Sequence, residues 1–243
     1  MKERPILMSG PMVRAILEGR KAQTRRVVKR QESFDPRVDL TGAVPEMRSR
    51  YPFLRLADGG EFGGPIRCPY GQPGDRLWVR ETWANYQTVN HVALPDGRAF
   101  SEVSDGQAAY RADGHDTIQD LKDHIRLMSG LDLEAVEVRG DRWIPSIHMP
   151  RWACRLVLEI TAVRVERLQG ISAADVTAEG CDTVGESMWG SRWWVDAPQR
   201  AIDDAVGVFR NLWTSTYGQE SWDANPWVWV IEFRKAAQAG EAR

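Results

Sequence analysis

The segment from Gly19 to Arg26 holds the densest group of side chains that could do chemistry. Its sequence is Gly19-Arg20-Lys21-Ala22-Gln23-Thr24-Arg25-Arg26, which displays three arginines, a lysine and a hydroxyl. These are the donor types that bind phosphate or polarise a carbonyl group. From Arg14 to Arg30 there are seven Lys or Arg residues and one acid, Glu18. The segment therefore predicts a site for an anionic or carbonyl-bearing ligand, and the alternative is a solvated basic edge.

Two further pairs of residues are candidates for binding a nucleobase. Glu81 and Trp83 lie at the end of a predicted strand, where the carboxylate can accept hydrogen bonds from an amine edge and the indole can stack on a base. Because the chain has 11 Trp, core packing is the alternative for Trp83. His148 and Arg151 flank Met149-Pro150, which suits contacts to a phosphate or a base edge, and a structural turn is the alternative there.

Other chemistries find no support in the sequence. His91, His115 and His124 lack the spacing of metal ligands, and the three cysteines lie far apart. No glycine-rich phosphate loop and no Gly-x-Ser-x-Gly elbow occurs. We therefore expect neither a metal nor a cofactor.

The helices and strands that must position these residues follow from the periodicity of apolar residues and from the residues that cap or end helices. Gly19 ends the first helix, Ser172 caps a later helix that Gly180 ends, and a turn or bulge is expected near Thr161. The last strand has two apolar faces, which predicts a central place in its sheet. We expect strands at 5–8, through 27–28, and at 76–83, 152–168 and 227–234, and helices at 11–18, 117–128, 172–179 and 200–217.

Two long segments do not show this periodicity. Residues 31–75 carry many Pro, Gly and charged residues and are interpreted as a long loop. Residues 86–141 are interpreted as a polar excursion that is a poor candidate for core. The chain is thus expected to be one domain, 1–243, of α+β class, with insertions at about 31–70 and 86–141 and strands arranged as a small barrel.

Composition narrows the possible surroundings and partners. The chain has 243 residues, 42% of them hydrophobic and 27% charged, with a formal net charge of −2. That balance is typical of a globular protein and gives no overall attraction to phosphate, so nucleic-acid binding would depend on a local patch. No apolar run approaches the ~20 residues of a membrane span, and the N-terminus lacks the features of a signal peptide. We expect a cytoplasmic protein with no membrane contact, and the sequence leaves the oligomeric state open.

Five motifs resemble the ASCH domain, a member of the PUA-like barrel superfamily, and are most similar to phage and prophage ASCH proteins. The first motif, with its Thr-Arg-Arg continuation, is the family's most specific feature. The motifs are Pro11-Met12-Val13-Arg14-Ala15-Ile16-Leu17-Glu18-Gly19-Arg20-Lys21 with Thr24-Arg25-Arg26, Gly74-Asp75-Arg76-Leu77-Trp78-Val79-Arg80-Glu81-Thr82-Trp83, Ile147-His148-Met149-Pro150-Arg151-Trp152, Ala178-Glu179-Gly180, and Ser221-Trp222-Asp223-Ala224-Asn225-Pro226-Trp227.

The resemblance implies recognition of RNA or of a modified nucleoside. One small bacterial member of the family is an amidohydrolase that deacetylates N4-acetylcytidine with a Lys, a Thr and a Glu, which match Lys21, Thr24 and Glu179. Many relatives carry Thr where this chain has Ala22. The resemblance thus implies that Lys21, Thr24 and Glu179 form a catalytic trio, and the chemistry of the side chains predicts nucleoside or nucleic-acid binding by Arg20, Arg25, Arg26, Glu81, Trp83, His148 and Arg151.

The chemistry of such a trio has physical requirements. A threonine hydroxyl becomes a nucleophile when a base removes its proton, and a lysine serves as that base if burial or nearby cations lower its pKa. Glu179 would then give a proton to the departing amine. In an ideal strand residues 21 and 24 face opposite sides, so Lys21 must lie in the loop before the strand. The alternatives are that Lys21 pairs with an acid at a helix end, that Thr24 is only a strand former, and that Glu179 faces solvent.

Three functions follow from these residues. The leading one is an amidohydrolase acting on an N-acylated nucleobase such as that of N4-acetylcytidine. A non-catalytic reader of RNA or modified DNA and a ribonuclease with the same basic cleft are the alternatives.

Overall fold

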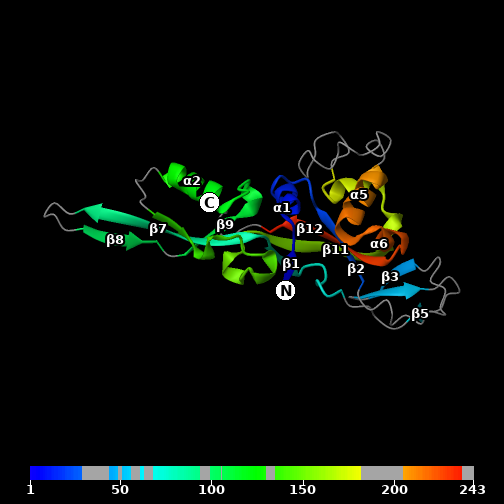
Figure 1. Cartoon of the computed structure of the whole chain (residues 1–243). Coiled ribbons are helices and arrows are strands. Elements are labelled where there is room, and N and C mark those ends of the chain that lie inside the picture. Colours follow the sequence, from blue (N-terminus) through cyan, green and yellow to red (C-terminus); the bar gives the residue numbers. More distant parts are fainter. Residues whose placement is uncertain are drawn as a thin grey trace. The chain divides into compact units, whose positions relative to one another are not determined.

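The computed structural model describes residues 1–28, 44–48, 51–55, 61–62, 68–93, 99–104, 106–129, 135–181 and 205–236. These residues form a mixed α+β structure (Figure 1), which confirms the predicted class. Packing divides the chain into two compact units. The first unit comprises residues 1–4, 15–77 and 156–243, and the second comprises 5–14 and 78–155.

The largest sheet has five strands in the order β1-β6-β11-β12-β2. Their bounds are Glu3–Leu7, Arg76–Arg80, Val157–Arg167, Trp227–Lys235 and Gln23–Val27. β12 pairs antiparallel with both β11 and β2, so it lies inside the sheet as its two apolar faces predicted. The pairing of β11 shifts register between Ile160 and Ala162, which confirms the irregularity expected near Thr161.

Four helices accompany these strands. α3 begins after Ser172, whose hydroxyl accepts a hydrogen bond from the Asp175 amide while the Asp175 carboxylate accepts one from the Ser172 amide. Gly180 then ends it with a φ of 80°, as the sequence predicted. Residues 200–204 of the predicted 200–217 helix lie outside the described residues. The helices are α1 Gly10–Leu17, α3 Ala173–Ala178, α5 Ala205–Tyr217 and α6 Gln219–Asp223, of which the sequence did not predict α6.

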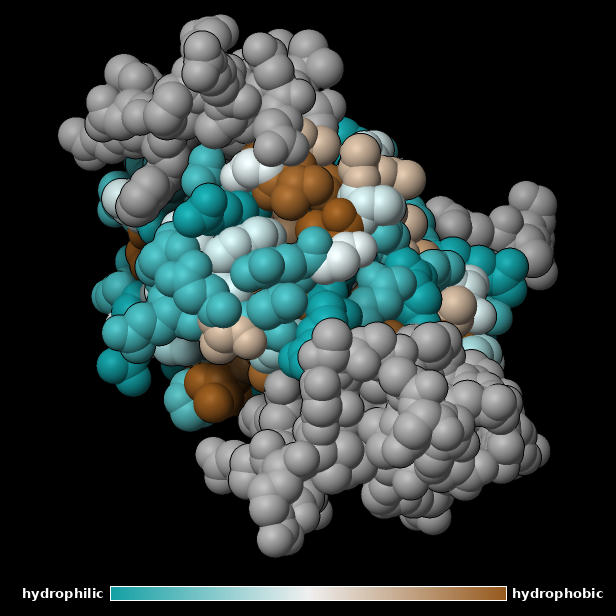
Figure 2. All heavy atoms as spheres, turned by 90° about the vertical axis from the view of Figure 1, so that its right-hand side faces the viewer, coloured by the Kyte–Doolittle hydropathy of each residue, from teal (hydrophilic) through white to brown (hydrophobic). Residues whose placement is uncertain are grey.

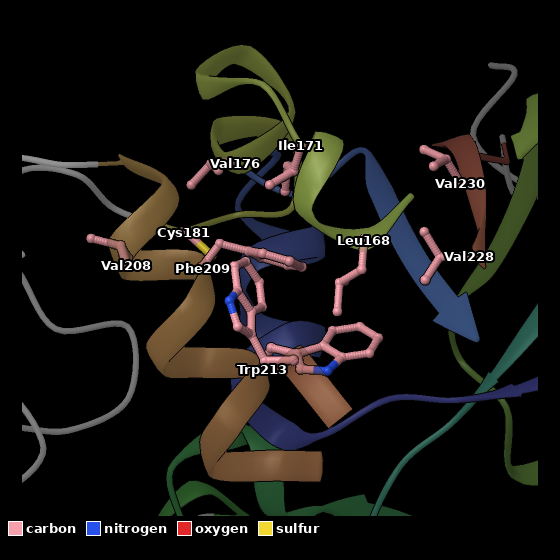
Figure 3. Close-up of a cluster of buried hydrophobic side chains, with 10 residues drawn as sticks. Leu168, Ile171, Val176, Cys181, Val208, Phe209, Trp213, Val228 and Val230 are labelled. Atoms are coloured by element: carbon pink, nitrogen blue, oxygen red, sulfur yellow. The ribbon is translucent and has the colours of Figure 1, made fainter. Parts of the chain in front are cut away.

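One face of β12 packs against α5 in the first unit. Figure 3 shows the rings of Phe209 and Trp213 projecting from α5 toward Leu168, with Val228 and Val230 contributed by β12. Burying large aromatic and aliphatic side chains is the main favourable term in folding. This cluster therefore fixes α5 and the neighbouring α3 against the strands that carry the candidate site.

A second sheet belongs to the second unit and corrects the interpretation of residues 86–141. That segment was expected to be a polar excursion, but it forms strands and a helix, and its residues Leu121 and Val138 are buried in one core cluster with Ala84. The apolar residues are contributed a few at a time by separate strands, so no single window shows a clear period. The elements are β7 Trp83–Ala93, β8 Ala99–Val103, β9 Gln107–Tyr110, β10 Ala135–Val138 and α2 Ile118–Ser129, with order β10-β7-β8 and β9 paired to β7. The helix agrees with the predicted 117–128.

A third sheet corrects the interpretation of residues 31–75 as a loop. Its strands follow the order β3-β4-β5, with bounds Val44–Arg48, Tyr51–Arg55 and Glu61–Phe62. β3 and β4 pair antiparallel from Val44 with Arg55 to Arg48 with Tyr51. Pro45 and Pro52 lie within these strands, and proline lowers any sequence-based strand expectation.

The described strands form open sheets with no closed barrel among them, so the predicted small barrel is not seen in this part of the chain. The single domain with insertions at about 31–70 and 86–141 stays a prediction. None of the described helices has the length and apolarity needed to cross a membrane. On the face shown in Figure 2, hydrophilic residues cover most of the described surface, with separate hydrophobic patches between them.

Short 3-10 turns complete the described chain. They lie at Arg111–Asp113, Arg139–Asp141, Ser146–His148, Arg151–Ala153 and Leu168–Gly170. The third and fourth of these turns flank Met149-Pro150, where the sequence allowed for a structural turn.

Two glycines with the same backbone conformation allow a controlled test of the packing around Lys21. Gly180 and Gly19 have φ of 80° and 77°, but a Cβ on Gly180 would lie 2.9 Å from the Lys21 Cβ, whereas one on Gly19 meets nothing within 4 Å. Left-handed backbone costs an alanine roughly 1–2 kcal/mol at either position. We expect Gly180→Ala to lower the free energy of unfolding in urea by clearly more than Gly19→Ala. Equal losses would show that Gly180 is not packed against Lys21.

Candidate functional site

Lys21 lies in the loop between α1 and β2, as convergence with Thr24 requires. The amides of Arg20 and Lys21 both donate to the Ala15 carbonyl, at 2.8 and 3.0 Å, which turns the chain at the end of α1. The Ala22 amide donates to the Ala178 carbonyl at 2.8 Å. This bond ties the start of β2 to the end of α3, next to Glu179.

Lys21 and Glu179 form a buried pair. The Lys21 Nζ donates to the Glu179 Oε2 at 2.6 Å and to the Glu179 carbonyl oxygen at 2.8 Å. The side chains are 1% and 4% exposed, respectively. Glu179 therefore does not face solvent, and that alternative is wrong. Lys21 does pair with an acid at a helix end, so the alternative for Lys21 describes its contact correctly.

Thr24 makes no hydrogen bond to Lys21 or Glu179. Its side chain is buried on β2 opposite Ile231, and its hydroxyl has no hydrogen-bond partner among the described residues. The next residue, Arg25, reaches the Glu179 carboxylate, and neighbouring residues of a strand point to opposite faces. The structure thus joins two members of the predicted trio and leaves the third unbonded. Because all three are buried, they do not line an open cleft.

Arg25 lies inside an ionic network. Its side chain is 0% exposed, and its Nη2 lies 3.0 Å from the Glu166 Oε2 and 3.2 Å from the Asp175 Oδ2. Its Nη1 lies 3.6 Å from the Glu179 Oε1. Arg164 closes the network, because its Nη2 donates to the Asp175 Oδ1 at 2.7 Å. The buried Arg25 guanidinium therefore holds three carboxylates together and presents no donor to solvent.

Asp175 shows the electrostatic effect of the network. Burial raises the pKa of its carboxyl. Hydrogen bonds from the side chain and amide of Ser172 and the charges of Arg25 and Arg164 lower this pKa by more than burial raises it, so it lies below its ordinary value. Asp175 caps α3 and pairs with both arginines, so it links the helix that ends at Glu179 to the strand that carries Arg25.

Much of the positive charge in the basic segment is therefore neutralised within the fold. Arg20 donates from Nε to the Glu18 Oε2 at 2.8 Å, Lys21 pairs with Glu179, and Arg25 contacts three carboxylates. Arg26 is half-buried. Sequence inspection found one acid nearby because the other partners come from residues 166–179. The assignments of Arg20, Arg25 and Arg26 to nucleic-acid binding stay predictions.

Glu81 is likewise engaged in the second unit. Its two carboxylate oxygens accept from the Arg155 Nε and Nη2, both at 3.0 Å. Burial raises the pKa of Glu81, although the Arg155 hydrogen bonds and charge oppose the rise. Arg155 also stacks 3.9 Å from the Tyr110 ring centroid and pairs with Asp113. In this arrangement the Glu81 carboxylate binds an arginine rather than a ligand amine.

Trp83 is a core residue, whereas the predicted binding residues His148 and Arg151 are exposed. Trp83 is 4% exposed and packs with Met149 and Ala153, which is the core-packing alternative. His148 and Arg151 are exposed beside them, as binding residues would be. Sequence reasoning missed Trp152, which is 59% exposed, although it follows Arg151 directly in the sequence.

The described residues contain no group of three or more His, Cys, Asp or Glu that could hold a metal ion. A polar depression of about 700 Å³ lies in the second unit beside β7 and β10, and none of the predicted site residues lines it. Comparisons of the chain with protein-family models, with curated proteins and with solved structures find no match in any of the three.

The buried pair gives a second stability test. Lys21→Met leaves the Glu179 carboxylate buried without its closest cation, and removing one partner of a buried pair typically costs about 3–5 kcal/mol. We expect Lys21→Met to cost several times more in chemical unfolding than Lys122→Met, which breaks a more exposed 2.6 Å pair with Asp141. Adding Glu179→Leu should recover part of the loss. Additive costs would contradict a direct interaction.

Asp175 gives a pH-dependent prediction. Because its folded pKa lies below the ordinary value of 3.8, its stabilising contribution is complete above that pH and is lost as the pH falls through the folded pKa. We expect the difference in unfolding free energy between wild type and Asp175→Asn to shrink steadily as the pH is lowered below 3.8. A difference that is constant or grows with acid would contradict the network.

Proposed function

We propose that this chain binds a nucleoside or nucleic acid and hydrolyses an N-acyl group from a nucleobase, as in N4-acetylcytidine, in an ASCH-type fold of the PUA-like barrel class. The observation that carries the proposal is the buried 2.6 Å contact between Lys21 and Glu179 at the start of the strand that holds Thr24. The motif resemblance indicates the substrate class, and the Lys21–Glu179 contact supports acid–base chemistry.

A single proton transfer would make this pair into the required base and acid. Moving the proton from the Lys21 Nζ to the Glu179 Oε2 converts an ammonium and a carboxylate into a neutral amine and a carboxylic acid. One short contact can thus supply both groups that amide hydrolysis needs.

The reaction then proceeds in two balanced stages. The Lys21 amine takes the proton of the Thr24 hydroxyl, and the Thr24 Oγ1 forms a bond to the acyl carbon. The C–N bond breaks as Glu179 donates its proton to the departing exocyclic amine. Water then loses a proton to the Glu179 carboxylate and attacks the acyl-threonine ester, while the Lys21 ammonium returns a proton to the Thr24 Oγ1 as the C–O bond breaks; acetic acid leaves, and the hydroxyl and the neutral amine–carboxylic acid pair are restored. The Thr24 hydroxyl has no partner among the described residues, and the first step requires β2 to turn it toward the Lys21 Nζ.

Burial sets a condition on substrate entry. All three side chains are buried, so part of their cover must move before an acylated base can reach them. A water-poor site of this kind strengthens the electrostatic interactions within it.

A non-catalytic reader is the second candidate. The observation that favours it is that the Thr24 hydroxyl donates to neither Lys21 nor Glu179. A reader would bind modified RNA or DNA without turnover, whereas a ribonuclease with the same residues would release oligonucleotide fragments.

Substitution of Thr24 gives the sharpest test. Thr24→Val keeps the shape of the side chain and removes a buried hydroxyl without a partner, so the fold should keep its stability. If Thr24 is the nucleophile, Thr24→Val abolishes release of acetate from N4-acetylcytidine, whereas Thr24→Ser retains part of it. Lys21→Met should lower the rate by ~10² to 10⁴, provided that its unfolding curve shows a folded protein.

Thr216→Val is the matched control, since it removes an exposed hydroxyl on α5 that bonds within its helix. Full turnover by Thr24→Val would exclude Thr24 as the nucleophile. Absence of turnover by wild type across a panel of acylated nucleosides, together with binding of one of them, would favour the reader.

A further inference from the structure

Two histidines of the second unit lie side by side. The ring centroids of His115 and His124 are 4.7 Å apart, and the ring planes meet at 50°. Their spacing in the sequence is not that of neighbours on a helix, because His115 precedes α2 and only His124 lies within it. The turn before the helix therefore brings together two imidazoles whose sequence positions did not predict a metal site.

Hydrogen-bonded turns on both sides fix the backbone of His115. Before it, the Gly114 amide donates to the Arg111 carbonyl at 3.2 Å, and Gly114 has a φ of 101°. After it, the Thr117 amide donates to the Asp120 Oδ2 at 3.0 Å, while the Asp120 amide donates to the Thr117 Oγ1 at 3.1 Å. This reciprocal pair caps the start of α2, so the position of His115 relative to the helix is determined.

Buried apolar side chains hold the elements on either side of His115. Ala112, in the 3-10 turn before it, is 4% exposed, and Leu121 of α2 is 2% exposed. Leu121 packs in the cluster that contains Ala84 and Val138. The two histidine backbones are therefore placed by packing and hydrogen bonds, and their positions do not depend on the contact between the rings.

Both imidazoles have nitrogen atoms available to a ligand. Neither ring makes a hydrogen bond or an ion pair with another residue in the described part of the chain. His115 is half-buried and His124 is exposed. A neutral imidazole carries one nitrogen lone pair, which is the form that binds metals. Each ring can therefore turn about its Cβ–Cγ bond and offer that nitrogen to an ion.

The charges around the pair do not oppose a bound cation. Residues 111–129 carry four aspartates against three cations other than histidine, which are Arg111, Lys122 and Arg126. Both cations of α2 contact carboxylates, at 2.6 Å for Lys122 and 2.9 Å for Arg126. Asp113 in turn contacts Arg155. A dication between the two rings therefore meets no excess of positive charge from these elements.

The distance between the rings fits a shared metal ion. With metal–nitrogen distances of about 2.0–2.1 Å, two imidazoles in neighbouring positions of one ion hold their centroids roughly 4.5–5.2 Å apart. The observed 4.7 Å lies in this range. We infer that His115 and His124 together bind a divalent transition-metal ion of the class that imidazole favours, such as Ni²⁺, Cu²⁺ or Zn²⁺, with water in the remaining positions. The site uses none of the residues of the proposed hydrolase.

Calorimetric titration of the full chain, prepared without a histidine tag, with Ni²⁺ tests the site. Two linked ligands bind ~10² to 10⁴ more tightly than one, so His115→Ala and His124→Ala should each weaken Ni²⁺ binding at least about a hundredfold. Ni²⁺ should bind more tightly than Co²⁺, and Co²⁺ more tightly than Mn²⁺, whereas Mg²⁺ should not compete because it prefers oxygen ligands. Ni²⁺ should also raise the Tm of wild type and leave that of both variants unchanged.

His148→Ala is the matched control, since it removes an exposed histidine of the same unit that has no ring contact within the described residues. This variant should bind Ni²⁺ as wild type does. Tight binding that survives either His115→Ala or His124→Ala would show that the rings do not share an ion and would overturn the inference. A loss in His148→Ala equal to that in the other variants would indicate scattered surface binding, and no binding by wild type would leave only contact between the rings. Either of these results also overturns the site.

Discussion

Glu179 carries a carboxylate into a buried position at the end of α3, and a charge there is tolerated only because cations accompany it. Lys21 contacts one oxygen at 2.6 Å, and Arg25 lies 3.6 Å from the other. An isolated buried carboxylate would cost several kcal/mol, so these partners are a condition of the fold. The same contacts join the loop after α1, strand β2 and helix α3, and the proposed chemistry depends on this junction.

The junction also determines where the chain can meet an anionic ligand. Cations that are free in the sequence pattern form ion pairs with carboxylates of β11 and α3. The basic segment is therefore largely buried within the fold. In the second unit the guanidinium groups of Arg80 and Arg151 lie 5.3 and 6.0 Å from the ring centroid of Trp78.

Several buried polar atoms of the first unit lack a hydrogen-bond partner among the described residues, which lowers the stability of the folded state. The Thr24 hydroxyl and the Glu179 Oε1 have no hydrogen-bond partner among the described residues, and each such atom typically costs about 1–3 kcal/mol. Native proteins keep few of them, and those that remain often have a role in binding or catalysis. Besides these two, the Gln23 Nε2 and the Arg25 Nε and Nη1 also have no hydrogen-bond partner among the described residues.

Local patterns in the sequence determined the elements that have clear capping residues or a clear apolar pattern. Ser172 and Gly180 predicted both ends of α3, and the two apolar faces of β12 predicted its interior place, because capping and burial on both faces act through neighbouring residues. The strands within 44–62 and 83–110 were missed, since their stability comes from partners across the sheet rather than from their own periodicity. Only the tertiary structure decided which acids meet Arg25 and that Glu179 is buried, because those partners lie more than 100 residues away in the chain.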